Sequence, residues 1–261
     1  MNNRKILISG AGIAGPSLAY WLRHYGFEPV LVERAPSLRS GGYILDFWGL
    51  GFDVADKMGL LPALRRDSYD IDEVRIVDAQ GRKTGGFSAR AIQSVLGDRF
   101  FSILRSDLAN AIYQSLDGEV RTIFGDTITA IEQNDSAVRV SFQHAPAETF
   151  DLVIGAGGLH SPVRNLVFGP EGRFEKYLGY YVASFSVAGY PRRDAHAYVG
   201  HAAPGRQVSR YSLRDDRTVF FFTFVSDKRL RIGPHDLEAQ KGVLQKEFGQ
   251  DGWECADILK A

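Results

Sequence analysis

The sequence predicts an α/β fold in which a Rossmann-like parallel β-sheet is joined by an interleaved, mainly antiparallel β region. A short apolar run at 6–8 ends in a glycine-rich turn, and an amphipathic stretch follows at once. Apolar and polar residues alternate through much of 120–154, and aromatic-rich, strand-like segments cover 177–187 and 206–225. The first pattern is typical of a strand, turn and helix unit, and the other two indicate antiparallel strands.

The first element is a strand followed by a helix. Residues 6–8 form a compact aliphatic run that suits a strand buried on both faces. The apolar residues that follow recur at helical spacing, namely Leu18, Trp21, Leu22 and Tyr25. Gly26 ends this helix, the apolar segment 29–32 is a second strand, and Glu33 stands at its end.

The turn between the first strand and the first helix has the spacing Gly10-x-Gly12-x-x-Gly15. Gly10 permits the turn, Gly12 lets a pyrophosphate approach the backbone, and Gly15 lets the helix lie close to the strand. The helix N-terminus offers free N–H groups to the phosphates. Glu33 follows Gly15 by 18 residues, close to the roughly 20 expected of an acidic residue that binds an adenosine ribose. The alternative is a glycine-rich turn with a surface glutamate.

The chain then departs from regular βα repeats. A loop occupies 34–42, and we expect a helix over 105–116 that is capped by Ser106. Further elements are expected as an extended piece at 43–46, a helix at 51–60, a strand that runs into a turn at 74–81, and a strand at 99–104. Helices are expected at 236–248 and at the extreme C-terminus.

A second glycine-rich turn follows the strands of 120–154. Those strands are expected to form a small hairpin layer, after which the buried run 152–154 returns to the parallel sheet. Gly155, Gly157 and Gly158 close that run, and a short helix is expected to begin near Ser161. A glycine turn at the end of a buried strand favours a second wall for the same ligand, although it is also compatible with a plain tight turn.

Composition excludes several classes of protein. The 261 residues carry 31 Lys plus Arg and 31 Asp plus Glu, and this zero net charge favours neither a nucleic acid nor a membrane surface as partner. Cys255 is the single cysteine, which excludes an internal disulfide, and no Cys/His spacing resembles a metal site. The N-terminus shows no leader and no apolar run approaches membrane length, so we expect a cytoplasmic protein.

Three stretches together resemble the single-component flavin-dependent aromatic hydroxylases, the family of para-hydroxybenzoate hydroxylase. They are the glycine motif with Glu33-Arg34, then Leu104-Arg105-x-x-Leu108, then 151–164 with its glycine turn and Ser161-Pro-Val-Arg164. Within that family, Gly41-Gly-Tyr-Ile-Leu-Asp46 and the closing segment 246–253 are most similar to tetracycline-inactivating FAD monooxygenases. The resemblance covers the whole chain.

The resemblance implies a role for each matching residue. Gly10, Ala11, Gly12, Ile13, Ala14 and Gly15 would surround the FAD pyrophosphate. Glu33 would bind the adenosine ribose, and Arg34 would lie on the adenine side. Arg105 would reach the ribityl and phosphate region, and Asp46 would approach the isoalloxazine. Ser161 and Arg164 match the second motif, which in the family also affects NAD(P)H use, but Gly157 stands where Asp is usual.

The implied function is an FAD-dependent, NAD(P)H-oxidising monooxygenase that uses molecular oxygen on a small aromatic or polyketide-like molecule. The flavin carries the hard chemistry, so no catalytic side chain and no metal ligand is assigned. The implied regions are 1–72 with 96–169 for FAD binding, and 73–95 with 170–261 for a substrate-side sheet with C-terminal helices.

The family's closing strand and Gly-Asp helix have no match before Ala261. We therefore expect an open sheet edge that favours self-association or a partner chain. Two alternatives stay open. The first is a non-catalytic FAD- or nucleotide-binding remnant that needs a partner, and the second is an NAD-dependent dehydrogenase, which the irregular region after Glu33 disfavours.

Overall fold

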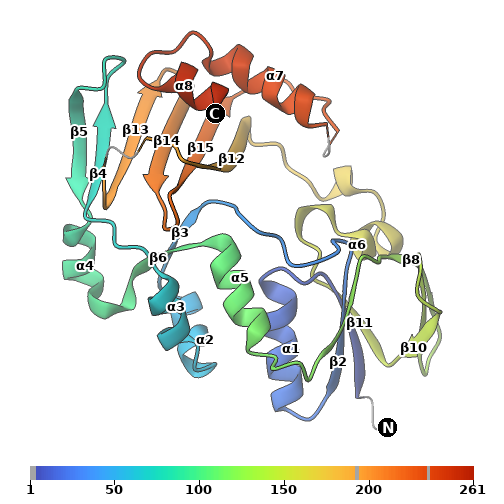
Figure 1. Cartoon of the computed structure of the whole chain (residues 1–261). Helices are drawn as coiled ribbons and strands as arrows, with labels where there is room; N and C mark the ends of the chain where they lie inside the picture. Colours follow the sequence, from blue (N-terminus) through green and yellow to red (C-terminus); the bar gives the residue numbers. More distant parts are fainter. Residues whose placement is uncertain (1–3, 192–193, 234–235) are drawn as a thin grey trace. The chain divides into compact units, whose positions relative to one another are not determined.

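The computed structural model describes residues 4–191, 194–233 and 236–261 (Figure 1). It contains two compact units, each built from two segments of the chain. The first unit comprises 1–40 and 106–176, and the second comprises 41–105 and 177–261. Residues 41–72 and 96–105 thus lie in the second unit, although the family resemblance assigns them to the FAD-binding region.

The first unit is organised around a parallel sheet of order β11-β1-β2-β7. The strands are β1 (Lys5–Ser9), β2 (Glu28–Glu33), β7 (Arg121–Phe124) and β11 (Leu152–Gly155). Residues of helices α1 (Ala14–His24) and α5 (Arg105–Gln114) pack on this parallel sheet. The first residue of α5, Arg105, is assigned to the second unit. Ile8 pairs with Leu31 on one side and with Ile154 on the other. Both Ile8 and Leu31 are fully buried, as a central parallel strand requires.

A smaller antiparallel sheet of order β10-β9-β8 completes this unit. Its strands are β8 (Ile128–Gln133), β9 (Val138–Phe142) and β10 (Glu148–Phe150), and helix α6 (Pro162–Val167) follows β11. Val140 and Phe150 are almost fully buried in a core that also includes Leu7 and Val163. The hairpin layer expected over 120–154 is therefore present.

The Asp126 carboxylate links the residue before β8 to the turn that follows β9. It accepts backbone hydrogen bonds from Thr127 (2.7 Å), Gln143 (2.9 Å), His144 (3.1 Å) and Ala145 (2.7 Å). Burial raises the pKa of Asp126, but these four donors together outweigh it and hold the pKa below its usual range. This carboxylate therefore serves the backbone, and its hydrogen bonds depend on its charge.

The second unit is organised around a six-stranded sheet of order β12-β15-β14-β13-β4-β5. The strands are β4 (Glu73–Val77), β5 (Lys83–Ser88), β12 (Tyr180–Ala188), β13 (Ala197–Ala203), β14 (Arg206–Ser212) and β15 (Arg217–Val225). Neighbours pair antiparallel except β13 and β4, which pair parallel. Sequence reasoning missed β13 and β5, because the first is rich in Ala and the second contains a Gly-Gly pair.

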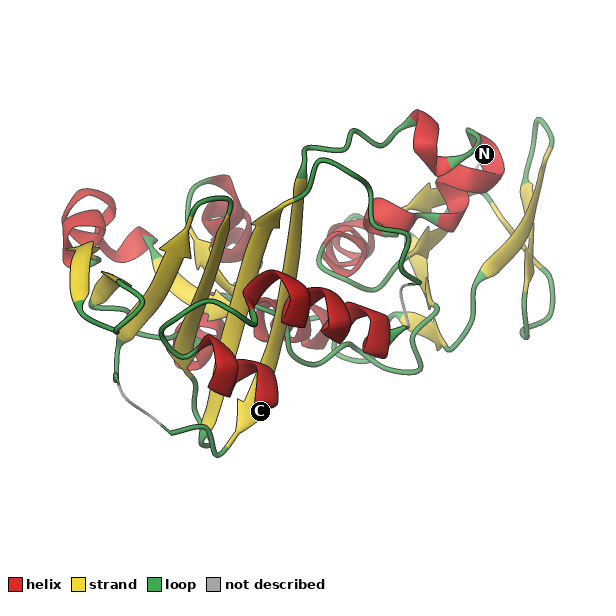
Figure 2. Cartoon of the chain, turned by 90° about the horizontal axis from the view of Figure 1, so that it is seen from above, coloured by secondary structure: helices red, strands yellow, loops and turns green. Residues whose placement is uncertain are grey.

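Helices α7 (Leu237–Phe248) and α8 (Cys255–Lys260) cover one face of this sheet (Figure 2). Phe220 and Phe222 are fully buried beneath them, and Phe248 of α7 is fully buried against Phe222. The expected helix 236–248 is confirmed, and the Asp236 side chain caps it by accepting from the Ala239 N–H at 3.0 Å.

A two-stranded ladder and short helices complete the second unit. Strand β3 (Ile44–Phe47) pairs antiparallel with β6 (Phe101–Leu104), and this pairing places 41–72 and 96–105 together. The helices are α2 (Leu50–Lys57), α3 (Leu61–Asp67) and α4 (Arg90–Leu96), and a 3₁₀ turn, η1 (Gly97–Arg99), follows α4. Two more 3₁₀ turns, η2 (Gly158–His160) and η3 (Glu171–Arg173), lie in the first unit.

Candidate functional site

The turn after β1, residues 10–15, is shaped by close approaches that only glycine allows. Gly10 has φ +115°, and a Cβ there would lie 2.6 Å from the Ala156 carbonyl oxygen. A Cβ on Gly15 would lie 1.9 Å from the Gly10 carbonyl oxygen. The Gly10 N–H donates to the Val32 carbonyl at 2.8 Å, which fastens the turn to the end of β2. We call residues 10–15 the phosphate loop, for the role that the glycine spacing predicts.

Helix α1 begins at this loop with an uncapped N-terminus. Its N-cap is Ile13, which has no side-chain cap hydrogen bond, and its first turn contains no acidic residue. The first N–H groups of a helix have no intrahelical acceptor, and the helix dipole makes this end favourable for an anion. The loop and the helix start therefore have the geometry of a phosphate site.

Glu33 lies next to this loop, and its carboxylate is held by the backbone. One carboxylate oxygen accepts from the Ala11 N–H at 2.9 Å, and the other accepts from the Ala35 N–H at 3.0 Å. Each oxygen keeps a lone pair that can accept from a ribose hydroxyl. Arg34 beside it is exposed.

The second glycine turn contacts the phosphate loop. The Ala156 N–H donates to the Ser9 carbonyl at 2.8 Å, and a Cβ on Gly10 would lie 3.0 Å from the Gly157 Cα. Gly157 itself has little free space, since a Cβ there would lie 3.2 Å from the Ser161 Cα. The structure thus brings together the predicted residues of the first unit, which are Gly10, Ala11, Gly12, Ile13, Ala14, Gly15, Glu33, Arg34 and Gly157.

Asp46 and Arg105 belong to the second unit and lie at the ladder of β3 and β6. Asp46 is exposed and pairs with Ser102, whose hydroxyl donates to the Asp46 carboxylate at 2.7 Å. The Arg105 N–H donates to the Tyr43 carbonyl at 3.0 Å. Sequence reasoning missed Ser102, because its partner lies 56 residues away in the chain. The cofactor roles of Asp46 and Arg105 stay predictions.

The large sheet exposes a second face opposite α7 and α8. Successive strand residues point to opposite faces, so Tyr180, Val182, Ser184 and Phe221 lie away from the phenylalanines under the helices. Tyr180 and Val182 are 60% and 55% exposed. The Tyr43 ring contacts Phe221 with centroids 5.4 Å apart. We call these five residues the aromatic face.

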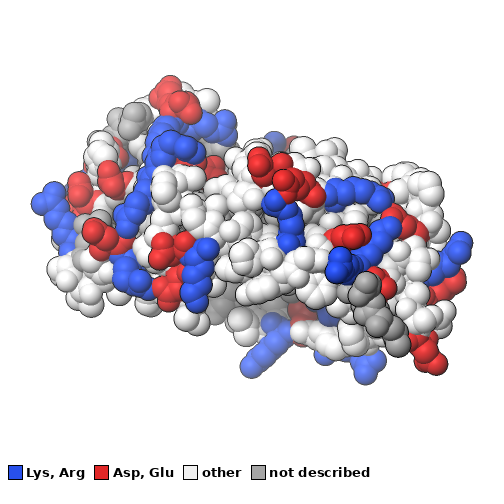
Figure 3. Space-filling model, turned by 90° about the horizontal axis from the view of Figure 1, so that it is seen from below, with Lys and Arg blue, Asp and Glu red and all other residues white. Residues whose placement is uncertain are grey.

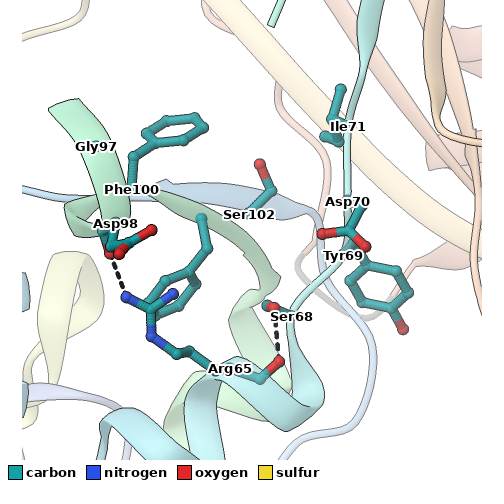
Figure 4. Close-up of a pocket in the computed structure, with 10 residues that line it drawn as sticks. Arg65, Ser68, Tyr69, Asp70, Ile71, Gly97, Asp98, Phe100 and Ser102 are labelled. Carbon is teal, nitrogen blue, oxygen red and sulfur yellow. Dashed lines mark hydrogen bonds between the residues drawn. The ribbon is translucent and has the colours of Figure 1, made fainter. Parts of the chain in front are cut away.

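Two cavities of the second unit are lined by residues other than those predicted to contact the cofactor, although Ser102, which lines the first, hydrogen-bonds Asp46. One has a volume of about 440 Å³ and is lined by Arg65, Tyr69, Asp98, Phe101 and their neighbours (Figure 4). In that view the Arg65 guanidinium points toward Asp98, to whose backbone carbonyl it donates. The guanidinium also lies 5.8 Å from the centroid of the Phe101 ring. The other, of about 400 Å³, is lined by paired charges such as Arg75, Asp194 and Arg210. Neither has a residue assigned to the cofactor.

A charge patch on the face seen in Figure 3, or a metal-binding cluster among the described residues, would be a further candidate site. On the face shown in Figure 3, basic and acidic side chains are intermixed and neither kind gathers in one large patch. Within residues 4–191, 194–233 and 236–261, no group of three or more His, Cys, Asp or Glu is placed to hold a metal ion. Across the same described residues, none of the helices has the length and apolar character needed to cross a bilayer.

No protein-family model matches the chain. Individual relatives do. An uncharacterized protein of Mycobacterium tuberculosis (strain ATCC 25618 / H37Rv) is 36% identical over 265 residues, which is 98% of this chain and 69% of that protein. A flavin-dependent monooxygenase of Legionella longbeachae serogroup 1 is 32% identical over 264 residues, which is 98% of this chain and 65% of that protein.

Solved structures agree with these relatives. The crystal structure of tetracycline destructase Tet(55) has a TM-score of 0.85 and 33% identity, and it aligns with 100% of this chain and 66% of its own. Klebsiella pneumoniae HpxO complexed with FAD and uric acid has a TM-score of 0.76 at 21% identity, and this likeness shows the fold alone. The chain belongs to the flavin-dependent monooxygenase family, which confirms the resemblance found in the sequence. It spans about two thirds of the length of the curated relatives that it matches.

Proposed function

We propose that this chain is an FAD-dependent monooxygenase that oxidises NAD(P)H and hydroxylates a small aromatic or polyketide-like molecule with molecular oxygen. The observation that carries the proposal is the phosphate loop with its uncapped helix and the backbone-held Glu33 carboxylate. Family membership supplies the class of reaction. The HpxO structure with bound FAD shares the fold and supports the choice of cofactor.

The residues of this chain fit the group that they are proposed to hold. The phosphate loop would take the pyrophosphate, Glu33 the adenosine ribose and Arg34 the adenine side, because anions favour a helix N-terminus and hydroxyls favour a carboxylate. Asp46 and Arg105 are proposed as the cofactor contacts of the second unit. When bound, FAD accepts a hydride from the nicotinamide and activates oxygen. The chain's own groups bind the cofactor, orient it and exclude water from it.

The aromatic face is the proposed wall for the substrate. Tyr43 and Phe221 offer flat apolar surface, and the Ser184 hydroxyl supplies a polar group among them. Aromatic side chains of this kind suit a planar ring system. The tetracycline destructase likeness supports a polycyclic substrate of that chemistry.

Gly157 bears on the use of NAD(P)H. The family's usual Asp would supply an acceptor, and its absence removes an ordinary hydrogen bond worth roughly 0.5 to 1.5 kcal/mol. The Ser161 hydroxyl accepts from the Arg164 N–H at 3.3 Å and caps α6, so this part of the motif stays formed. We propose that NAD(P)H is used, with weaker binding than a carboxylate at position 157 would provide.

Strand β11 is the proposed place for self-association or a partner chain. In the sheet order it pairs only with β1 among the described strands, and Leu152 is 48% exposed. An unpaired strand edge presents N–H and C=O groups to a further strand. The single buried cysteine fits the reducing cytoplasm that we propose as its compartment.

The test measures bound flavin, NAD(P)H consumption and hydroxylated product for the chain as given and for a version extended by a relative's C-terminal segment. We expect the parent to bind FAD, and Gly12→Val to lose it because a branched side chain blocks the approach of the pyrophosphate. Gly242→Ala is the control, since a Cβ there meets nothing within 4 Å.

Each outcome separates the alternatives. Flavin binding without turnover in either form supports the non-catalytic remnant. Binding of NAD without FAD, with hydride transfer to a substrate, supports the dehydrogenase. Equal FAD content in Gly12→Val and the parent contradicts the assignment of the phosphate loop.

A further inference from the structure

The position of the second glycine turn affects the shape of the phosphate loop. The Ala156 carbonyl lies where any side chain at position 10 would have to go, at 2.6 Å from a Cβ built on Gly10. The Ala156 N–H donates to the carbonyl of Ser9, the residue just before the loop, and a Cβ on Gly10 would also lie 3.0 Å from the Gly157 Cα, so the two turns are closely packed. Whatever holds the second turn therefore also holds one wall of the loop.

The distal side of this turn is held by Arg164. Its guanidinium donates to the Leu159 carbonyl at 2.6 Å and thereby fastens η2 to helix α6. The guanidinium also lies over the Phe174 ring, 5.9 Å from the centroid. Its Nε is buried and finds no acceptor among the described residues. Arg164 is thus a cation that is partly removed from water, and it needs a carboxylate to remain there.

Glu171 supplies that carboxylate. One oxygen accepts from the Arg164 guanidinium at 3.0 Å, and both oxygens lie 3.0 Å from the His160 Nδ1. The Glu171 and Arg164 side chains are 28% and 22% exposed, so water screens this pair less than an ordinary surface pair. Glu171 therefore holds both ends of 160–164, the segment that follows the turn.

We propose that Glu171 is a positioning residue for the dinucleotide site: it fixes Arg164 and His160, and through them it holds the second glycine turn against the phosphate loop. The proposal rests on the proposed function of that loop. The Glu171 carboxylate already contacts Arg164 and His160, so Glu171 acts through these basic residues. It is not proposed to touch the pyrophosphate, because two negative charges repel each other. No motif in the sequence marks it.

The experiment compares Glu171→Ala and Glu171→Gln with Glu132→Gln, which makes the same change of charge at an exposed position of the same unit. Affinities are measured by titration for FAD, for ADP-ribose, which contains the pyrophosphate, and for adenosine, which lacks it. We expect Glu171→Ala to bind FAD and ADP-ribose about tenfold more weakly, since the charge-assisted contact with Arg164 and the contact with His160 are both lost. Glu171→Gln should lose less, and adenosine affinity and the melting temperature should change little.

Raising the salt concentration should reduce the difference in FAD affinity between the parent and Glu171→Ala, because the contact that the substitution removes is ionic. Equal FAD affinities in the parent and Glu171→Ala would overturn the inference. So would an equal loss for all three ligands that is accompanied by a lower melting temperature, which would make Glu171 a purely structural residue. A parent that binds no FAD would instead refute the proposed function.

Discussion

The phosphate loop of the first unit and the aromatic face of the second are built from different parts of the polypeptide. The loop offers backbone N–H groups, and Gly10 and Gly15 serve it by having no side chain. The aromatic face offers the side chains of Tyr180 and Phe221 on a regular sheet, together with Tyr43, which lies just before β3 and contacts Phe221. A site formed by closely packed backbone groups allows few residue types, so the sequence motif that encodes it can be recognised. A side-chain site changes with each substitution while the sheet below it stays the same.

This difference also sets how large the effect of a mutation should be. A side chain forced into the loop must move the backbone, whereas a change on the aromatic face alters one contact.

Gly15→Val should have the largest effect. A Cβ at Gly15 would lie 1.9 Å from the Gly10 carbonyl oxygen, so the helix and the loop must separate. We expect loss of FAD and a destabilisation of about 3 kcal/mol or more, as for severe overpacking. Flavin absorbance and denaturant unfolding measure both effects, with Gly242→Ala as the control. A stable variant with full flavin content would show that the close approach is not needed.

Asp126→Ala should destabilise the first unit without touching the phosphate loop. Four backbone N–H groups lose their acceptor, which we expect to lower the free energy of unfolding by about 3 kcal/mol. Because the folded-state pKa of Asp126 is lowered, this stabilisation is present above the unfolded pKa of about 3.9 and is lost as pH falls through the folded value. Urea unfolding at several pH values measures it. If the difference in free energy of unfolding between the parent and Asp126→Ala stays constant down to strongly acidic pH, the stabilisation does not depend on the Asp126 charge and the prediction is wrong.

Glu33→Ala should weaken FAD binding by about 1.5 to 3 kcal/mol, the range for hydrogen bonds to a charged group. Two losses contribute, since the carboxylate holds the Ala11 N–H and is also placed for the ribose. Glu33→Gln separates them: it keeps an acceptor for one N–H but lacks the charge. Fluorescence titration with FAD gives the affinities. Unchanged affinity in Glu33→Ala would contradict both the ribose contact and the contribution of the Ala11 hydrogen bond to FAD binding.

Tyr43→Leu should have the smallest effect. Its ring contact with Phe221 is worth about 0.5 to 1.5 kcal/mol, and the sheet beneath does not depend on it. We expect weaker binding of a planar probe such as a tetracycline, with unchanged flavin content and melting temperature. Val54→Leu, at an exposed position of the same unit, is the control. Equal affinity for the probe in Tyr43→Leu and the parent would remove the aromatic face from the proposed substrate site.

The local elements could be predicted from the sequence, because their signals lie within short windows. Residues 4–33 contain the strand, the glycine turn, the helix and the second strand, and all of them are present. The helix expected over 236–248 begins one residue later, with Asp236 as its cap. Strands β5 and β13 were missed, because Gly-Gly and Ala-rich segments have weak strand propensity and pair only when neighbouring strands are in place.

The sequence by itself determined the phosphate loop, because a turn at a helix start depends on the residues that form it, and the contact between Gly15 and Gly10 lies within that short segment. Only the tertiary structure decided that Gly10 also lies against Ala156. Only the tertiary structure decided the partners of Glu171, the Asp126 cluster and the pairing of Asp46 with Ser102. These contacts join side chains to groups elsewhere in the chain, and no local pattern favours one partner over another. Hydrogen bonds of this kind form only after the chain has brought the groups together, so their physical cause lies in the fold.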